Sequence, residues 1–559
     1  MHRPPRFALP AIFTLSLALL HSYSAIGAQS PTAGPTQLSG TFRIAGTVVS
    51  LVDGHPLDRA RVTITDTKNS KNFQSTITSE DGRFEFKQVG PGKYSLQGAR
   101  RGFIPAAYDE HEQFSTAIVT GPDLDTENLM LHLAPTAMLS GKVFDEFGDA
   151  VRHATVTLYR EDHQSGVSRI RRFRNAQTDD QGSYVLSPLN AGTYFLSVMA
   201  TPWYALHPFS PVRQETQNSS GAMDRSLDVA YPVTYYADST DPEAATPIPI
   251  KGGDHPQVDF HLAPVPALHL RFHIAQNAGE QIGMPMLQKR GLDGTDAGQN
   301  NIETQMVSPG VFEMTGLAPG SYTVRTPATT SGQSARINDV DITNDDQELD
   351  TSSGEPTGSV KALIQLPGES KLPPQLNLAL RDGRGRIAAW AAVDTKGEAD
   401  FQEVAPGNYA VLVQSPGRAF SVVRISSQGH ESSGHTLTVA AGMPLTISLT
   451  LVGSTSSVSG FAKRARKAAP GAMVVLVPKD PDSNRELFRR DQSDLDGSFT
   501  LPNVIPGSYA IVAIEKGWSL DWSRPSVVAV YAQHGQAVIV PDRAERPIHL
   551  PDAVEVQAP

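Results

Sequence analysis

Residues 81–96 read DGRFEFKQVGPGKYSL, and this short segment sets the architecture of the chain. Its Asp-Gly and Pro-Gly pairs favour tight turns, because glycine adopts a positive φ without steric cost. Between the two turns, Phe84 and Phe86 alternate with charged residues, which is the period of a half-buried strand. A further apolar alternation begins at Tyr94, after the second turn. The segment therefore predicts two antiparallel strands joined by a tight turn.

The same pattern recurs four more times along the chain. The further copies lie at residues 181–196, 309–324, 396–411 and 496–511. Every copy keeps the separation seen between Gly82 and Tyr94, and a second glycine always lies two positions before the tyrosine. A fixed internal spacing of this kind indicates tandem structural units. We predict that each tyrosine places its ring in a core and its hydroxyl on a backbone partner. The five tyrosines are Tyr94, Tyr194, Tyr322, Tyr409 and Tyr509.

Each copy lies inside a longer recurring unit. Upstream, Gly46, Gly141 and Gly460 each belong to a short apolar strand, and downstream an alternation such as residues 129–133 closes the unit. About seven strands in roughly 100 residues is the size of an antiparallel β-sandwich. The sequence therefore predicts an all-β protein. It is a tandem array of about five antiparallel β-sandwich domains, of immunoglobulin-like or transthyretin-like type, after a signal peptide.

The ends of the repeats give predicted boundaries, and we call the segments units 1 to 5. Unit 1 covers 38–134, unit 2 covers 135–264, unit 3 covers 265–355, unit 4 covers 356–452 and unit 5 covers 453–559 with a short tail. Unit 2 carries an insertion at 201–257. Unit 3 is divergent, because its first strand lacks the recurring glycine.

Residues 1–28 have the layout of a secretory signal peptide. Arg3 and Arg6 precede an apolar run at 8–20, and small residues lead to a cleavage site after Ala28. Residues 29–37 then predict a flexible start. The alternative is an uncleaved anchor, although the run is short for a membrane span. We expect export, to the periplasm or by secretion, and no transmembrane segment after signal removal.

The composition excludes several classes of protein. The 559 residues contain no cysteine, which rules out disulfides, thiolate metal sites and cysteine nucleophiles. The net charge of −11 argues against a nucleic-acid partner, which needs a basic surface. The chain has no G-x-S-x-G, H-E-x-x-H or phosphate-loop motif. We therefore predict no catalytic residues, no cofactor and no metal site.

The repeat resembles a known family. The string G-x-V, a polar turn, A-x-V-x-[IL] and then D-G-x-F-x-[FL]…P-G-x-Y resembles the carboxypeptidase regulatory-like domain, and units 1, 2 and 5 match it best. That family belongs to the transthyretin-like, carbohydrate-binding-like β-sandwiches and is related to collagen-adhesin B-type domains. The resemblance implies a β-sandwich fold and a non-catalytic accessory role. It does not name a ligand, since fold does not fix function.

Aromatic residues give the candidate ligand platform. They follow the last core strand of units 2 and 5 or belong to the insertion, where exposed rings would stack on the faces of sugars. The alternative is that the rings form a plug closing the end of each sandwich. The candidate residues are Trp203, Tyr204, Tyr235, Tyr236, Trp518 and Trp522.

These observations favour a non-catalytic exported protein that serves as a binding or scaffold protein of the cell envelope or extracellular space. Carbohydrate binding is the most specific form of this hypothesis, with a polysaccharide or an envelope or extracellular protein as the partner. One alternative is a hydrolase with a carboxylate site in the irregular second or third unit. The other is a purely structural spacer.

Overall fold

The computed structural model describes residues 40–164, 166–207, 224–274, 283–294, 302–329, 334–343, 347–367, 372–427, 430–542 and 546–559. The predicted signal peptide and flexible start lie outside these residues, as does part of the predicted insertion in unit 2. Within the described residues, no helix combines the length and the hydrophobicity that a membrane crossing requires.

The protein is built from paired β-sheets, which confirms the predicted all-β sandwich fold. In unit 1 the alternation at residues 83–89 forms a strand, and Phe84 and Phe86 point into the core. The first sheet holds β1 (Phe42–Ser50), β4 (Arg83–Val89) and β8 (Leu129–Leu133). The second holds β2 (Arg61–Asp66), β3 (Phe73–Ile77), β5 (Gly92–Ala99), β6 (Ala106–Ala107) and β7 (Ile118–Thr120).

Unit 2 repeats this arrangement, with β10 and β11 longer than the corresponding β2 and β3 of unit 1. Its first sheet holds β9 (Ala137–Phe144), β12 (Ser183–Leu189) and β17 (Phe260–His261). Its second holds β10 (Thr155–Asp162), β11 (Arg169–Gln177), β13 (Gly192–Met199), β15 (Thr234–Tyr235) and β16 (Ile248–Ile250). The short strands β14 (Val229–Ala230) and β18 (Val265–Pro266) pair with each other. Two 3₁₀ turns lie in the insertion: η1 (Arg225–Leu227) precedes β14, and η2 (Pro242–Ala244) lies between β15 and β16.

Units 3 and 4 each contain two four- or five-stranded sheets. In unit 3 the first sheet holds β19 (Leu268–His273), β21 (Glu303–Ser308), β22 (Val311–Leu317) and β25 (Gln347–Asp350). The second sheet holds β20 (Met286–Gln288), β23 (Gly320–Thr326), β24 (Arg336–Ile342) and β26 (Glu355–Pro356). A 3₁₀ turn, η3 (Thr351–Ser353), lies near the end of the unit. In unit 4 the first sheet holds β27 (Gly358–Gln365), β30 (Glu398–Val404), β32 (Phe420–Ser427), β33 (His430–Ser433) and β35 (Pro444–Gly453). The second sheet holds β28 (Asn377–Asp382), β29 (Ile387–Ala392), β31 (Gly407–Gln414) and β34 (Thr436–Val439).

Unit 5 differs because its two sheets are joined. The last strand, β44, pairs in parallel with both β36 and β41, so the strands form one continuous sheet of nine. The strands are β36 (Ser456–Arg464), β37 (Lys467–Ala468), β38 (Met473–Pro478), β39 (Arg489–Gln492), β40 (Ser498–Val504), β41 (Gly507–Ile514), β42 (Gln536–Val540), β43 (Ile548–His549) and β44 (Val554–Gln557). The unit also holds η4 (Arg485–Leu487), η5 (Gly517–Ser519) and the helix α2 (Pro525–Ala532).

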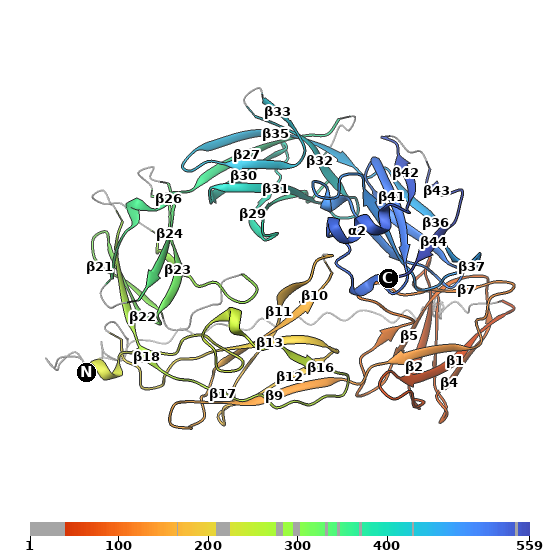
Figure 1. Ribbon diagram of the computed structural model, residues 1–559, viewed down its shortest axis with the longest axis horizontal. Helices are drawn as coiled ribbons and strands as arrows, with labels where there is room; N and C mark the ends of the chain where they lie inside the picture. Colours follow the sequence, from red (N-terminus) through yellow and green to blue (C-terminus); the bar gives the residue numbers. More distant parts are fainter. Residues whose placement is uncertain are drawn as a thin grey trace, which may run out of the picture.

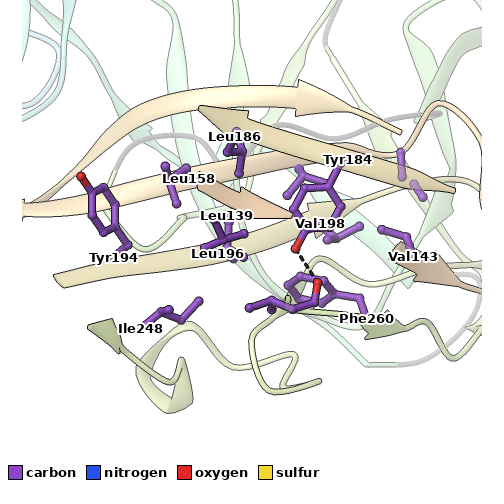
Figure 2. Close-up of a cluster of buried hydrophobic side chains, with 14 of the residues drawn as sticks. Leu139, Val143, Leu158, Tyr184, Leu186, Tyr194, Leu196, Val198, Ile248 and Phe260 are labelled. Atoms are coloured by element: carbon purple, nitrogen blue, oxygen red, sulfur yellow. Dashed lines mark hydrogen bonds between the residues drawn. The ribbon is translucent and has the colours of Figure 1, made fainter. Parts of the chain in front are cut away.

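The hydrophobic cores follow the sequence units. Five large clusters of buried side chains draw their members from residues 44–133, 137–262, 268–342, 360–451 and 458–556. Figure 2 shows the cluster of unit 2, with Leu139, Leu186 and Leu196 between its two sheets. The boundaries between the units stay predictions.

The recurring tyrosine occupies the same place in every unit. Its hydroxyl donates to the backbone carbonyl four residues earlier, which confirms the predicted backbone partner and core position. This contact ties the strand that begins at the Pro-Gly or Ala-Gly turn to the end of the preceding strand. The bonds run from Tyr94 to Gly90, from Tyr194 to Asn190, from Tyr322 to Ala318, from Tyr409 to Ala405 and from Tyr509 to Ile505.

Replacing Tyr509 by phenylalanine tests this contact. Burial raises the pKa of the Tyr509 hydroxyl to about 12, and the hydroxyl lies 2.7 Å from the Ile505 carbonyl. Removing the hydroxyl leaves the buried Ile505 carbonyl with one hydrogen bond fewer, so we expect unit 5 to lose about 1–2 kcal/mol of stability. Hydrogen exchange read by mass spectrometry on the peptides of unit 5 measures the loss.

Tyr531→Phe is the control for this measurement. Tyr531 is half-buried on α2 of the same unit, and its hydroxyl makes no hydrogen bond within the described residues. We expect this variant to unfold like the parent protein. An equal loss of stability in both variants would contradict the role assigned to the recurring hydroxyl.

In units 1 and 2 the recurring first-strand glycine is explained by a parallel pairing that the sequence did not predict. In each unit the first strand pairs antiparallel with the strand of the repeat and parallel with a strand near the end of the unit. A Cβ atom on Gly46 would lie 2.1 Å from the carbonyl oxygen of Leu129 on the parallel strand. A Cβ atom on Gly141 would lie 1.7 Å from the carbonyl oxygen of Val258. Only glycine permits so close an approach of two backbones.

The five units form a closed arrangement, in which unit 5 returns to unit 1 (Figure 1). The Lys93 ammonium of unit 1 lies 2.6 Å from the Asp494 carboxylate of unit 5. The hairpin of β10 and β11 projects toward the middle of the arrangement (Figure 1). There the Ser523 amide of unit 5 donates to the Gly166 carbonyl of unit 2 at 3.0 Å. The chain is therefore a ring of units and not an extended string.

Candidate functional site

Trp203 and Tyr204 of the predicted platform lie at one end of unit 2, shortly after β13. The Trp203 side chain is 84% exposed, and its ring makes an edge-to-face contact with Tyr204 at a centroid distance of 5.7 Å. A backbone hydrogen bond from Ala205 to Pro202 closes the turn that carries the two rings. Trp203 therefore offers an open ring face on a locally fixed backbone.

A carboxylate lies beside these rings. Glu146 accepts a hydrogen bond from the Tyr204 hydroxyl and another from the buried Tyr231 hydroxyl, the latter at 2.7 Å. Burial alone would raise the pKa of Glu146, but the two hydroxyl donors outweigh it and hold the pKa below its usual value. Burial and the bond to Glu146 raise the pKa of Tyr204 to about 12. The Glu146 carboxylate is therefore a negatively charged hydrogen-bond acceptor that the two tyrosine hydroxyls hold in place.

The turn after β9 positions Glu146 and a further aromatic ring. The buried Asp145 carboxylate accepts hydrogen bonds from the amides of Phe147 and Asp149, at 3.0 and 2.7 Å. Gly148 completes the turn with a φ of +85°. Phe147 is 75% exposed, beside the residue that binds Tyr204. We call Glu146, Phe147, Trp203, Tyr204 and Tyr231 the Glu146 cluster.

Tyr235 and Tyr236 lie elsewhere in unit 2. Tyr235 is 1% exposed and belongs to β15, so its ring is enclosed by the protein. Tyr236 is half-buried and meets Phe260 edge to face at 6.3 Å. The structure therefore does not bring these two rings into the Glu146 cluster.

Trp518 and Trp522 lie in a buried cluster in unit 5. Their side chains are 8% and 9% exposed. Arg490 of β39 lies over Trp522, with its Cζ atom 4.5 Å from the ring centroid, and over Trp518 at 5.3 Å. These rings hold a guanidinium, and neither presents an open face to a ligand.

A loop of unit 1 covers the tryptophan cluster. His111 stacks on Trp518 with ring centroids 5.1 Å apart, and Phe114 lies 5.6 Å from the same ring. The two tryptophans pack with Met473 and Val475 on the face of β38 opposite to the one that carries Val474 into the main core of unit 5. This buried cluster also joins two distant units.

Ion pairs surround this contact between units 1 and 5. Glu112 pairs with Arg490, and the two side chains are 18% and 5% exposed. The Asp494 carboxylate accepts hydrogen bonds from Lys93 and from the Ala117 amide. Burial raises the pKa of Asp494 even though Lys93 opposes the shift. We call this contact the unit 1–unit 5 interface.

An acidic cavity lies between units 2 and 3, the region of the hydrolase alternative. It has a volume of about 960 Å³. Asp339 and Asp341 are one strand period apart on β24 and accept hydrogen bonds from Thr323 and Ser321 on β23. Two further acids and two basic residues line the cavity, and they are Asp241, Glu243, Lys289 and Arg290.

Sequence reasoning missed Glu146, Phe147 and Arg490. The string Glu146-Phe147-Gly148 has the composition of a turn, and an aromatic residue inside a polar turn is the available signal. Arg490 carries no comparable signal, because its aromatic partners lie several strands further along unit 5 or in another unit.

The fold and these sites define a multi-unit β-sandwich protein. Residues 43–121 match the family model of the carboxypeptidase regulatory-like domain, which confirms the predicted resemblance in unit 1. Colossin-A of Dictyostelium discoideum is 21% identical over 498 residues. The match covers 79% of this chain but only 4% of Colossin-A.

Several solved structures also match the chain. The Bacillus anthracis TIE protein is 11% identical with a TM-score of 0.17, covering 73% of this chain and 74% of that chain. The minor pilin GBS52 of Streptococcus agalactiae is 14% identical with a TM-score of 0.21, covering 40% and 97%. The major pilin subunit BcpA of Bacillus cereus is 9% identical with a TM-score of 0.14, covering 73% and 99%.

Proposed function

We propose that the protein is a non-catalytic, exported scaffold that binds polysaccharide through the Glu146 cluster. The observation that carries the proposal is the 84% exposed ring of Trp203, held edge to face by Tyr204. An exposed indole provides a flat apolar face for the C–H face of a sugar ring. The adjacent Glu146 carboxylate accepts hydrogen bonds, as sugar hydroxyls require.

The ring arrangement supports the scaffold part of the proposal. Contacts between units 1 and 5 fix the two ends of the array relative to each other. A platform on such a body keeps a defined orientation toward the polymer that it binds. Export rests on the predicted signal peptide.

Trp203→Ala tests the proposal. We expect the variant to bind its polysaccharide about tenfold more weakly, because roughly 1.4 kcal/mol of stacking is lost. Affinity electrophoresis across a panel of polysaccharides measures the change. Trp390→Ala is the matched control, since Trp390 is 53% exposed on β29 of unit 4 and should not contribute.

Two results would overturn this proposal. One is retention on no polysaccharide, and the other is equal weakening by both tryptophan variants. The same incubations test the hydrolase alternative through the release of reducing ends. Hydrolysis that Asp339→Asn abolishes would place an enzyme site in the acidic cavity between units 2 and 3.

A further inference from the structure

A second cavity lies between units 4 and 5, away from the Glu146 cluster. It has a volume of about 650 Å³, within the range of small-molecule sites. Strands β28, β31 and β32 of unit 4 form one side, and residues of η4 and β39 of unit 5 form the other. Val411, Phe420 and Val422 supply an apolar part of the lining.

Three polar side chains of this cavity lack hydrogen-bond partners among the described residues. The guanidinium of Arg381 is half-buried and makes no hydrogen bond or ion pair there. Both carboxylate oxygens of Glu486 and the hydroxyl oxygen of Ser415 are buried without a hydrogen bond. The Nδ1 atom of His435 approaches Glu486 only to 3.6 Å. Buried polar groups without partners are rare in proteins, and a bound molecule would satisfy them.

The charge of the lining selects the ligand. Arg381, Arg418 and Arg489 line the cavity against the single carboxylate of Glu486. Arg489 donates a hydrogen bond to the Asn503 carbonyl, and Arg418 donates one to the Ser454 carbonyl of unit 5. These two arginines contribute positive charge to the cavity, whereas the N–H groups of Arg381 are available to a ligand. Burial lowers the pKa of both Arg381 and Arg489, as expected where positive charge is enclosed with too little negative charge.

We propose that this cavity binds an acidic saccharide, a sugar ring that carries a carboxylate beside its hydroxyls. The carboxylate would pair with Arg381, whose planar donors fit it bidentately. Sugar hydroxyls would donate to Glu486 and exchange a hydrogen bond with Ser415. The surplus of arginines disfavours an ammonium group near Glu486, so a hydroxyl fits better. The apolar wall would contact the C–H face of the ring.

Isothermal titration of the purified full chain with trigalacturonate tests the proposal. We expect saturable binding that Arg381→Gln weakens at least tenfold and that Glu486→Gln weakens several-fold. Arg384→Gln is the matched control, because Arg384 is exposed on the turn after β28. The affinity of this variant for trigalacturonate should stay within twofold of that of the parent protein. Arg381→Lys keeps the charge without the bidentate geometry, so its affinity should lie between those of the parent protein and Arg381→Gln. Melting curves show whether each variant is folded.

Other probes decide between the proposed ligand and simpler explanations. Maltotriose, which lacks the carboxylate, should not bind, and sulfate should bind more weakly and be insensitive to Glu486→Gln. The proposal is overturned if trigalacturonate does not bind or if sulfate and trigalacturonate bind equally. It is also overturned if Arg381→Gln leaves the affinity unchanged. Trp203→Ala should not alter this binding, so the two sites can fail independently.

Discussion

Replacing Gly141 by alanine is expected to lower the stability of unit 2 by at least about 3 kcal/mol, a large effect for one methyl group. The added Cβ atom would lie 1.7 Å from the backbone carbonyl oxygen of Val258. That carbonyl also accepts a hydrogen bond from the buried Tyr184 hydroxyl at 2.6 Å (Figure 2). Relief of the clash must therefore move the parallel strand or break a buried hydrogen bond.

Hydrogen exchange read by mass spectrometry localises the effect to unit 2 and avoids assuming that a multi-unit chain unfolds in one step. Gly383→Ala is the control. A Cβ atom on Gly383 meets nothing within 4 Å, so its effect should stay within about 0.5 kcal/mol. Equal effects of the two substitutions would contradict the steric explanation of the recurring glycine.

The second large effect is expected at the unit 1–unit 5 interface. Arg490→Met removes the charge but keeps an apolar side chain over the rings of Trp518 and Trp522. The Glu112 carboxylate, 18% exposed, then loses its ion-pair partner. Removing one partner of a buried pair costs about 3–5 kcal/mol, so we expect the contact between the two units to weaken strongly.

Small-angle X-ray scattering measures the result as an increase in the radius of gyration, because the ring opens where its first and last units meet. Arg464→Met removes an exposed pair with Glu515 inside unit 5 and should leave the scattering unchanged. Adding Glu112→Gln to Arg490→Met should recover part of the loss, because no unpaired carboxylate remains. Unchanged scattering of the Arg490 variant would show that this pair does not hold the ring closed.

The fold was predictable because it rests on local patterns. Phe84 and Phe86 alternate with charged residues in the sequence, and both are buried in β4. The hydroxyl of Tyr94 reaches the carbonyl of Gly90, only four residues earlier, so its role could be inferred from one short repeat. Each of these features depends on neighbours within a single copy of the repeat.

The candidate site was only partly predictable. Trp203 and Trp518 occupy corresponding positions after the last core strand of their units, and the sequence treats them alike. In the structure one ring is 84% exposed and the other 8%. Trp518 packs in a buried cluster of its own unit, and His111 and Phe114, from the unit at the opposite end of the array, also cover it. No local pattern reports such a contact.

The repeat, the strands, the turns and the core tyrosines follow from sequence alone, because they depend on spacing and side-chain alternation. The tertiary structure was needed to establish the parallel pairing at Gly46 and Gly141 inside units 1 and 2, and the packing of the units was needed to establish the closure of the ring. The exposure of each aromatic side chain also depends on contacts that are distant in sequence. The cavity that holds Arg381 and Glu486 also exists only because units 4 and 5 pack together. The physical reason is that these features join residues distant in sequence, where no periodicity links one partner to the other.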